Sequence, residues 1–272
     1  EQITEIRESY GIDRPVILRY FESIGAFLRG DFGYSVQSGA KVSDLIAEAL
    51  PSTLALASIA LVGAVFLAVV IAFTASYGKG TWLRRLFRNL PPLFISLPVF
   101  WIGIILIQVF SFRLGLIPVI GASPVQAIIL PAITLMIPIA APLAQVFLRS
   151  IDEVREQPFV SVVRSRGAST SWLLWRNVAP NALLPALTMA GLLFGELVGG
   201  AIVTEAVFGR VGIGNLTAQA VANRDTPVLL AVVVIATVVF VTINLAVDLL
   251  YPVLDARLRR SGSGRGASKR DV

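Results

Sequence analysis

Five long apolar runs, separated by polar connections, dominate the pattern of hydrophobic and polar positions along this chain. Each run could span a bilayer core of about 30 Å, which requires roughly 20 helical residues whose backbone groups are satisfied within the segment. The pattern therefore predicts an all-α, polytopic membrane bundle. The five predicted spans are approximately Pro51 to Ser76, Pro91 to Phe112, Gln126 to Leu148, Ala182 to Val203 and Val228 to Leu250.

The third predicted span contains Pro131, Pro138 and Pro142. Each proline removes a backbone donor and frees a carbonyl, which neighbouring helices must then help to satisfy. We therefore expect this helix to be kinked and to lie in the interior of the bundle.

Composition agrees with a membrane protein and narrows its chemistry. Of 272 residues, 56% are hydrophobic and 15% are charged, and the mean hydropathy is +0.79. The sequence has no cysteine and no histidine, which excludes disulfides, thiolate or imidazole metal ligands, and Cys or His nucleophiles. We expect no metal site, no catalytic residue and no cofactor in this chain.

Basic residues are distributed asymmetrically between the connections. Fifteen of the 23 Lys and Arg residues lie after the first span, in the insert 149–181 and in the tail 251–272, whereas three lie in the two short connections on the opposite side. The positive-inside rule therefore places the insert and the C-terminal tail in the cytoplasm, and residues 1–48 outside. Residues 49–250 form the expected transmembrane domain, and the basic, Gly/Ser-rich tail is typical of a flexible segment beside an anionic leaflet.

The outward segment contains apolar residues at helical spacing between Pro15 and Leu28. This spacing predicts either an amphipathic helix on the outer membrane interface or an ordinary packed surface helix. Because the chain begins with Glu1 rather than Met, and because five spans place its two ends on opposite sides, we expect a sixth span to precede this sequence.

The predicted spans contain few of the residues that could couple transport to an energy source. Ionisable residues within them are restricted to Glu196 and Asp248, whereas ion-coupled carriers need several such groups at membrane depth. The GKGT sequence beginning at Gly78 lacks the spacing of a nucleotide-binding loop and is better interpreted as a turn. If the protein transports a solute, its energy must come from another subunit, and the insert is the connection large enough to receive that subunit.

Within the insert, Gly167 is suited to end one helix, because glycine readily adopts the left-handed conformation. Ser169 and its neighbours can cap a further helix of about two turns that ends near Asn177. Trp172 and Trp175 share a face of this predicted helix. They suit either a hydrophobic groove in a partner protein or the lipid headgroup region.

The insert resembles the permease subunits of ABC importers, specifically the B-type subunit of the dipeptide, oligopeptide and nickel group. That family carries a Glu-Ala-Ala signature, a Gly three residues later and a Pro thirteen residues beyond that Gly. Gly167 and Pro180 match this spacing, while Ser161, Val162 and Val163 replace the Glu-Ala-Ala. RSRGAS and RNVAPNALLP resemble the family's version, as do, in order along nearly the whole chain, GIDRP, RGDFGYS, PSTLALA, TEAVFGRVGIGNL, RDTP and NLAVDLLYPVLDARLR.

The resemblance implies a type I importer permease of six spans that translocates dipeptides or oligopeptides, with nickel, glutathione or another small solute as the alternative. It implies a second permease subunit, two ATPase subunits that bind ATP and Mg, an extracytoplasmic binding protein, and location in the cell membrane. Ser169 to Asn177 would be the coupling helix. The residues expected to contact the ATPase are Arg164, Arg166, Gly167, Ala168, Ser169, Thr170, Trp172, Leu173, Trp175, Arg176 and Pro180.

Two further features of the sequence each have two possible roles. Gly191, Gly195 and Gly199 form a small-residue face that could contact the partner permease or pack within the chain. The connection 204–223 is either a gating or re-entrant loop that meets the binding protein or a simple surface loop. Its candidate gate residues are Glu205, Phe208, Gly212 and Gly214.

Two other classes of function compete with a permease subunit. A membrane-embedded enzyme would need an intramembrane Ser/Lys pair or paired carboxylates, and neither Glu196 nor Asp248 has a visible partner in the sequence. A self-sufficient channel or ion-coupled carrier is disfavoured by the sparse intramembrane charge. Both alternatives predict activity of this chain without an ATPase.

Overall fold

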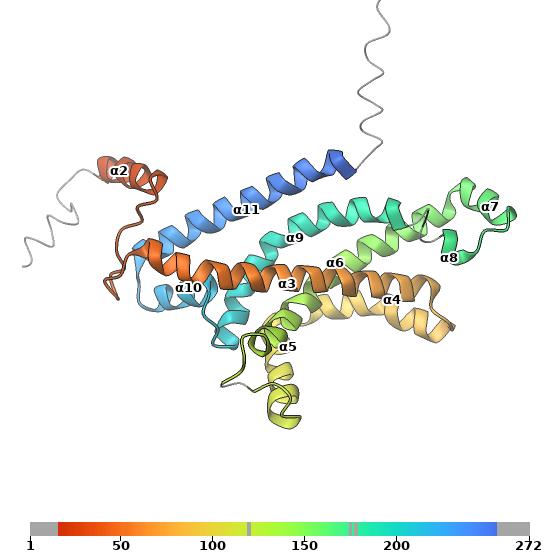
Figure 1. Cartoon of the computed structure of the whole chain (residues 1–272), viewed down its shortest axis with the longest axis horizontal. Helices are drawn as coiled ribbons and strands as arrows, with labels where there is room; N and C mark the ends of the chain where they lie inside the picture. Colours follow the sequence, from red (N-terminus) through yellow and green to blue (C-terminus); the bar gives the residue numbers. More distant parts are fainter. Residues whose placement is uncertain (1–15, 119–120, 174–175, 177–178, 255–272) are drawn as a thin grey trace, which may run out of the picture.

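The structure, a computed structural model, describes residues 16–118, 121–173, 176 and 179–254. It is a helical bundle, as the apolar runs predict. Its long helices extend roughly along one axis (Figure 1). The elements are α2 (Val16–Leu28), α3 (Val42–Tyr77), α4 (Thr81–Ser96), α5 (Val99–Leu106), the π-helix η1 (Ile107–Arg113), α6 (Gln126–Glu156), α7 (Pro158–Ser165), α8 (Thr170–Leu173), α9 (Ala179–Val207), α10 (Ile213–Ala222) and α11 (Thr226–Leu254).

Four helices in the described part of the chain are long and apolar enough to cross a membrane. A fifth crossing is obtained if α4 and the segment Val99–Arg113 are counted as one bent span. The four helical stretches are Val42–Tyr77, Gln126–Glu156, Thr188–Val207 and Thr226–Ala246.

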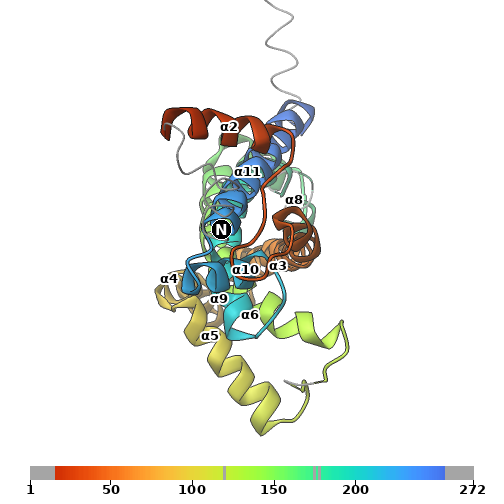
Figure 2. The ribbon, with the colours of Figure 1, turned by 90° about the vertical axis from the view of Figure 1, so that its left-hand side faces the viewer.

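The second predicted span, Pro91 to Phe112, is not one continuous helix. The chain bends by 106° between Thr81–Ser96 and Val99–Arg113. Leu97 adopts an extended conformation (φ −89°, ψ 124°) directly before Pro98, because the proline ring disfavours helical backbone in the preceding residue. As a result α5 leaves the direction of the bundle (Figure 2). Three of the four basic residues in the connection after the first span, Arg84, Arg85 and Arg88, lie on helix α4.

The centre of the bundle is the contact between α3 and α6. A row of fully buried alanines on α3 lets the two helices approach closely, as small residues do in membrane helix packing. Gly63 belongs to the same contact, since a Cβ there would lie 2.7 Å from the Met136 sulfur. The buried alanines are Ala57, Ala60, Ala64, Ala68 and Ala72.

The proline-containing helix α6 lies in the interior, as predicted. It continues through Pro131, Pro138 and Pro142, and 56% of its apolar window is buried, against 17% for α11. The carbonyl freed by Pro138 lies at Thr134, whose own hydroxyl donates to the Leu130 carbonyl at 2.8 Å. Helix α9 packs on this pair, and α11 packs mainly on α9 and exposes most of its apolar surface.

Helix α2 occupies the range expected for the amphipathic helix but stands apart from the long helices (Figures 1 and 2). Its apolar side chains are exposed: Ile17 by 71%, Leu18 by 55% and Phe21 by 63%. An ordinary surface helix would bury these side chains against its own chain. The choice between a helix on the membrane interface and a packed surface helix stays a prediction.

The bundle has two distinct ends, which we name by their elements. The α10 end contains α10, the start of α3 and the residues 31–41 that precede it (Figure 1). The insert end contains α7, α8 and the turn between α3 and α4 (Figure 1). Most residues predicted to be functional lie at one end or the other.

Candidate functional site

At the α10 end, Glu205 is fully buried near the end of α9. Its carboxyl group accepts a hydrogen bond from the Thr53 hydroxyl at 2.6 Å and from the backbone N–H groups of Gly214 at 2.7 Å and Asn215 at 3.3 Å. The Thr53 hydroxyl accepts in turn from the Ile213 N–H at 2.8 Å. These five residues form a network, here called the closure network, that caps the N-terminus of α10 with side chains from α3 and α9.

The cap satisfies backbone donors that a helix N-terminus otherwise leaves unpaired. It also explains the glycines of this segment, because a Cβ on Gly212 would overlap the Glu205 carboxyl group and a Cβ on Gly214 would overlap the backbone of Ile202. Three of the four predicted gate residues thus belong to one packed unit. The expected loop contains a ten-residue helix that packs on α9, α11 and α3.

The fourth gate residue, Phe208, lies in the α9–α10 connection against α5. A Cβ on Gly103 would be 3.2 Å from its ring. Phe208 also lines a cavity of about 510 Å³ between η1, α6 and this connection. Arg210, which lines the same cavity, donates to the Ala127 carbonyl at 3.3 Å and to the Ser52 hydroxyl at 3.2 Å, and so joins the connection to α3 and α6.

A second polar contact at the α10 end joins residues far apart in the sequence. Asp225, 2% exposed and directly before α11, accepts hydrogen bonds from the Ser35 hydroxyl and from the N–H groups of Val36 and Gln37. Burial by itself raises the pKa of Asp225, but these hydrogen bonds and one from the Val228 N–H outweigh it, so the pKa lies below its usual value. These hydrogen bonds hold residues 31–41 against the start of α11.

The sequence reasoning missed the roles of Thr53, Arg210, Ser35 and Asp225. A signal was present for Asp225, because an Asp immediately before Thr-Pro is typical of a helix N-cap. For Thr53 and Ser35 the local sequence carries no such signal, since their partners lie 152 and 190 residues away.

At the insert end, Gly167 has φ +83° and follows α7, the left-handed conformation expected of a helix-ending glycine. The Ser169 hydroxyl accepts from the Trp172 N–H at 3.2 Å, which is the geometry of an N-cap. The described helix, α8, extends over Thr170–Leu173. Trp175 and the expected helix end at Asn177 lie outside the described residues.

The described part of this insert has one inward and one outward side. Leu173 is fully buried in the main hydrophobic core, whereas Trp172 is 46% exposed. The Arg176 guanidinium lies over the Trp172 ring, 5.9 Å from its centroid. Around them, Arg166, Gly167 and Ser169 are exposed and Ala168 is half-buried, while Arg164, Thr170 and Pro180 lie in α7, α8 and α9 respectively.

The glycines predicted to form a packing face on α9 have different surroundings. A Cβ on Gly195 would overlap the Phe240 ring of α11, so this position packs within the chain. Gly191 is buried, whereas a Cβ on Gly199 would meet no described atom within 4 Å. The face is therefore used internally at Gly195 and left open at Gly199.

Three comparisons identify the class of protein that this architecture represents. By fold it matches an inward-facing methionine ABC transporter, MetNI, with TM-score 0.65 and 18% identity over 77% of this chain and 96% of that one. It also matches an amino acid ABC transporter crystallised with histidines, with TM-score 0.61 and 18% identity over 77% and 94%. The fold is therefore that of an ABC importer permease.

The sequence gives the family. Residues 64–260 match the binding-protein-dependent transport system inner membrane component, and the chain belongs to that family. It is 36% identical to the glutathione transport system permease protein GsiC of Escherichia coli K12 over 254 residues, 93% of this chain and 83% of the relative. The GsiC protein of Salmonella typhimurium is also 36% identical, over 257 residues. Within the family the chain is an ABC importer permease of the peptide and nickel group.

Proposed function

We propose that this chain imports short peptides, glutathione among them, as the permease subunit of an importer whose ATP hydrolysis takes place on partner subunits. The observation that carries the proposal is its 36% identity, over 93% of its length, to a glutathione transport permease. Glutathione is a tripeptide, so the glutathione and short-peptide readings describe one substrate class. Nickel or another small solute is the alternative that the substrate test below would reveal.

The proposed assembly contains a second permease subunit, two ATPase subunits and an extracytoplasmic binding protein. The insert 149–181 and the tail 251–272 face the cytoplasm, and residues 1–48 face outward. This orientation rests on the excess of Lys and Arg at the insert end. The chain is accordingly the conduit and the mechanical link, and it contributes no catalytic group of its own.

The segment from Ser169 to Asn177 is the proposed contact with the ATPase. Leu173 fixes its inward side in the core, and the half-exposed Trp172 with Arg176 stacked over it is left for a partner. A large aromatic side chain held on a rigid base is typical of residues that dominate interface energetics. Movement imposed on this segment would reach α6 and α9, which flank the insert.

The closure network and Phe208 are the proposed outer gate. Glu205 joins the end of α9 and the first turn of α10 to α3, so α9, α10 and α3 move together at this end. Rocking of the long helices would therefore displace α10 as a rigid piece and open or close the path at the α10 end.

The substrate proposal is tested by transport. The chain is reconstituted in liposomes with its second permease subunit, ATPases and binding protein, and ATP-dependent uptake of labelled glutathione, a dipeptide and nickel is compared. Uptake of glutathione or the dipeptide, and identification of such a peptide bound to the purified binding protein, is the expected result. Uptake of nickel alone would overturn the peptide assignment, and uptake by this chain alone without ATP would overturn the importer mechanism.

The coupling proposal has a matched pair of variants. Trp172→Ala should weaken co-purification of the ATPase by about thirtyfold, because a hot-spot side chain contributes about 2 kcal/mol or more. Trp101→Ala is the control, because Trp101 is 45% exposed, nearly the same as the 46% of Trp172, but lies on α5. Equal retention of the ATPase by both variants would exclude Trp172 from the interface.

A further inference from the structure

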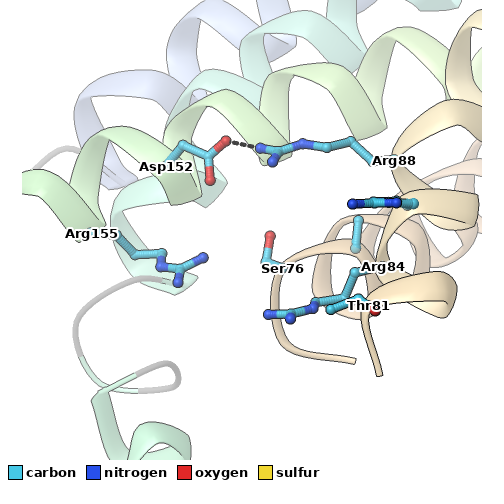
Figure 3. A pocket seen from close by; sticks show the side chains of 8 residues that line it. Ser76, Thr81, Arg84, Arg88, Asp152 and Arg155 are labelled. Atoms are coloured by element: carbon cyan, nitrogen blue, oxygen red, sulfur yellow. Dashed lines mark hydrogen bonds and ion pairs between the residues drawn. The ribbon is translucent and has the colours of Figure 1, made fainter. Parts of the chain in front are cut away.

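A basic pocket lies at the insert end, between the last turn of α3, the first half of α4 and the last turns of α6 (Figure 3). Its volume is about 240 Å³, many times the roughly 10–15 Å³ that one water molecule needs. It is separate from the insert residues proposed to meet the ATPase. Its lining residues are Ala75, Ser76, Thr81, Arg84, Arg85, Arg88, Asp152 and Arg155.

The charge of this pocket is strongly unbalanced. Asp152 forms an ion pair with Arg88, which joins α6 to α4. Within the described ranges no carboxylate forms an ion pair with Arg84, Arg85 or Arg155, and the Arg155 guanidinium lies instead over the Tyr77 ring, 5.2 Å from its centroid. Three guanidinium groups from two helices are thus left to attract an anion.

Ser76 gives an independent indication of a ligand. Its side chain is 7% exposed, it lines the pocket, and its hydroxyl has no hydrogen-bond partner among the described residues. A buried hydroxyl without a partner is costly, and a helical serine usually donates to a carbonyl in its own helix. Figure 3 shows this hydroxyl directed into the space between Arg88 and Arg155, where it can donate to an oxygen of a bound anion.

The outer surface of α4 indicates what carries the anion. Trp82 is 74% exposed, Leu86 41% and Leu93 52%, and their spacings of four and seven residues place them on one face of the helix. Trp82 lies three residues before Arg85, a spacing that makes the two side chains neighbours on the surface of a helix, and Arg85 lines the pocket. A phosphate next to a strip of exposed apolar side chains matches a phospholipid, whose acyl chains would follow α4.

We propose that the pocket binds the phosphate of an anionic glycerophospholipid, with Arg84, Arg85 and Arg155 neutralising it and Ser76 donating a hydrogen bond. Basic pockets between membrane helices on the cytoplasmic side are suited to such headgroups, and the positive-inside orientation places this pocket there. The lipid would bridge α3, α4 and α6 next to the insert. The inference concerns a site outside the proposed transport pathway and does not depend on the substrate.

The test uses the purified chain in nanodiscs of phosphatidylcholine, into which phosphatidylglycerol is titrated while native mass spectrometry counts bound lipid. The triple variant Arg84→Gln, Arg85→Gln, Arg155→Gln should lose binding by about fivefold for each arginine removed. The control Lys79→Gln, Arg113→Gln, Arg29→Gln removes the same charge outside the pocket and should bind as wild type does. An equal loss of phosphatidylglycerol binding in the two triple variants would show that binding depends only on net charge, and would overturn the proposed site.

Ser76→Ala is the sharper variant, because it removes no hydrogen bond within the described protein and should leave folding intact. It is expected to weaken phosphatidylglycerol binding about tenfold, whereas Ser58→Ala, an exposed serine on the same helix, should not. Competition by millimolar inorganic phosphate that displaces the lipid would assign the site to free phosphate instead. Loss of ATPase association with unchanged lipid binding in the arginine triple would assign the pocket to the ATPase interface.

Discussion

The two ends of the bundle differ in the burial and hydrogen bonding of their polar side chains. At the α10 end, Glu205 and Asp225 are almost fully buried, and backbone and hydroxyl donors surround each of them. At the insert end, the arginines are exposed, the Ser76 hydroxyl has no hydrogen-bond partner in the described part of the chain, and Trp172 is half-exposed. The two buried carboxyl groups of the first end are paired within the described chain, whereas the second end presents groups that another molecule must complete.

This difference suits the proposed roles. A gate must hold one defined shape, which buried and satisfied hydrogen bonds provide because any alternative arrangement would leave polar groups unpaired. A surface that receives an ATPase and lipid must remain accessible, so its groups stay exposed until the partner arrives. Substitutions at the α10 end should therefore reduce stability, and those at the insert end should reduce association.

The largest expected effect is that of Glu205→Ala. The substitution leaves the Thr53 hydroxyl and the Gly214 and Asn215 N–H groups without their acceptor, and each orphaned buried donor costs about 1–3 kcal/mol. The free energy of unfolding, measured by denaturant titration in detergent, should fall by about 3 kcal/mol or more. Glu196→Ala on the same helix, where the side chain is exposed, should change it by less than about 0.5 kcal/mol, and an equal loss in both variants would contradict the closure network.

A smaller loss is expected for Gly214→Ala. The new methyl group would overlap the Ile202 backbone, so α9 and α10 must separate, at a cost of about 1–3 kcal/mol. Gly199→Ala, with open space around the position, should instead stabilise α9 by up to about 1 kcal/mol, because alanine favours a helix over glycine. The same unfolding titration measures both, and a destabilised Gly199→Ala would show that this face is already occupied.

The contact at Asp225 should depend on pH. Because its pKa is lower in the folded chain than in the unfolded one, its contribution is fully present above about pH 4 and is lost as the pH falls through the folded pKa. Asp225→Asn should therefore destabilise the protein by about 1–3 kcal/mol at pH 6, and the difference from wild type should narrow as the pH falls below about 4. Glu48→Gln, which removes an exposed acid on α3, is the control for the loss of one negative charge.

The smallest effect is expected for Arg88→Gln at the insert end. The ion pair with Asp152 is 56% and 39% exposed on its two sides, and pairs in such surroundings contribute about 0–1 kcal/mol. Thermal unfolding should change only slightly. A loss greater than about 2 kcal/mol would show that the insert end is as tightly closed as the α10 end, which would remove the contrast between them.

The positions of the long helices could be predicted from the sequence because hydropathy is a local property. Four of the five apolar runs became long helices, and α6 is interior as its three prolines indicated. The second run, Pro91 to Phe112, is interrupted at Leu97 and Pro98, where the backbone preference of a residue before proline overrides the continuous apolar pattern. The left-handed conformation of Gly167 could likewise be predicted, because glycine has no Cβ and adopts a positive φ without steric cost.

The polar contacts could be predicted only in part. Glu205 was selected as a gate residue, but its use as the cap of α10 required Thr53, 152 residues earlier, to lie beside it. The basic pocket likewise combines arginines of α4 and α6 with the end of α3, although the arginines themselves had been counted only as a sign of orientation.

The sequence by itself determined that this chain is a helical membrane permease, because apolar length and short motifs are properties of consecutive residues. Only the tertiary structure decided which polar groups are satisfied and which await a partner. That outcome depends on the packing of α3, α6 and α9, which brings Thr53 to Glu205 at one end and leaves Ser76 facing arginines at the other. Helix packing, and not local preference, therefore determines that the buried carboxyl groups of the α10 end are paired within the chain and that the insert end presents groups for a partner.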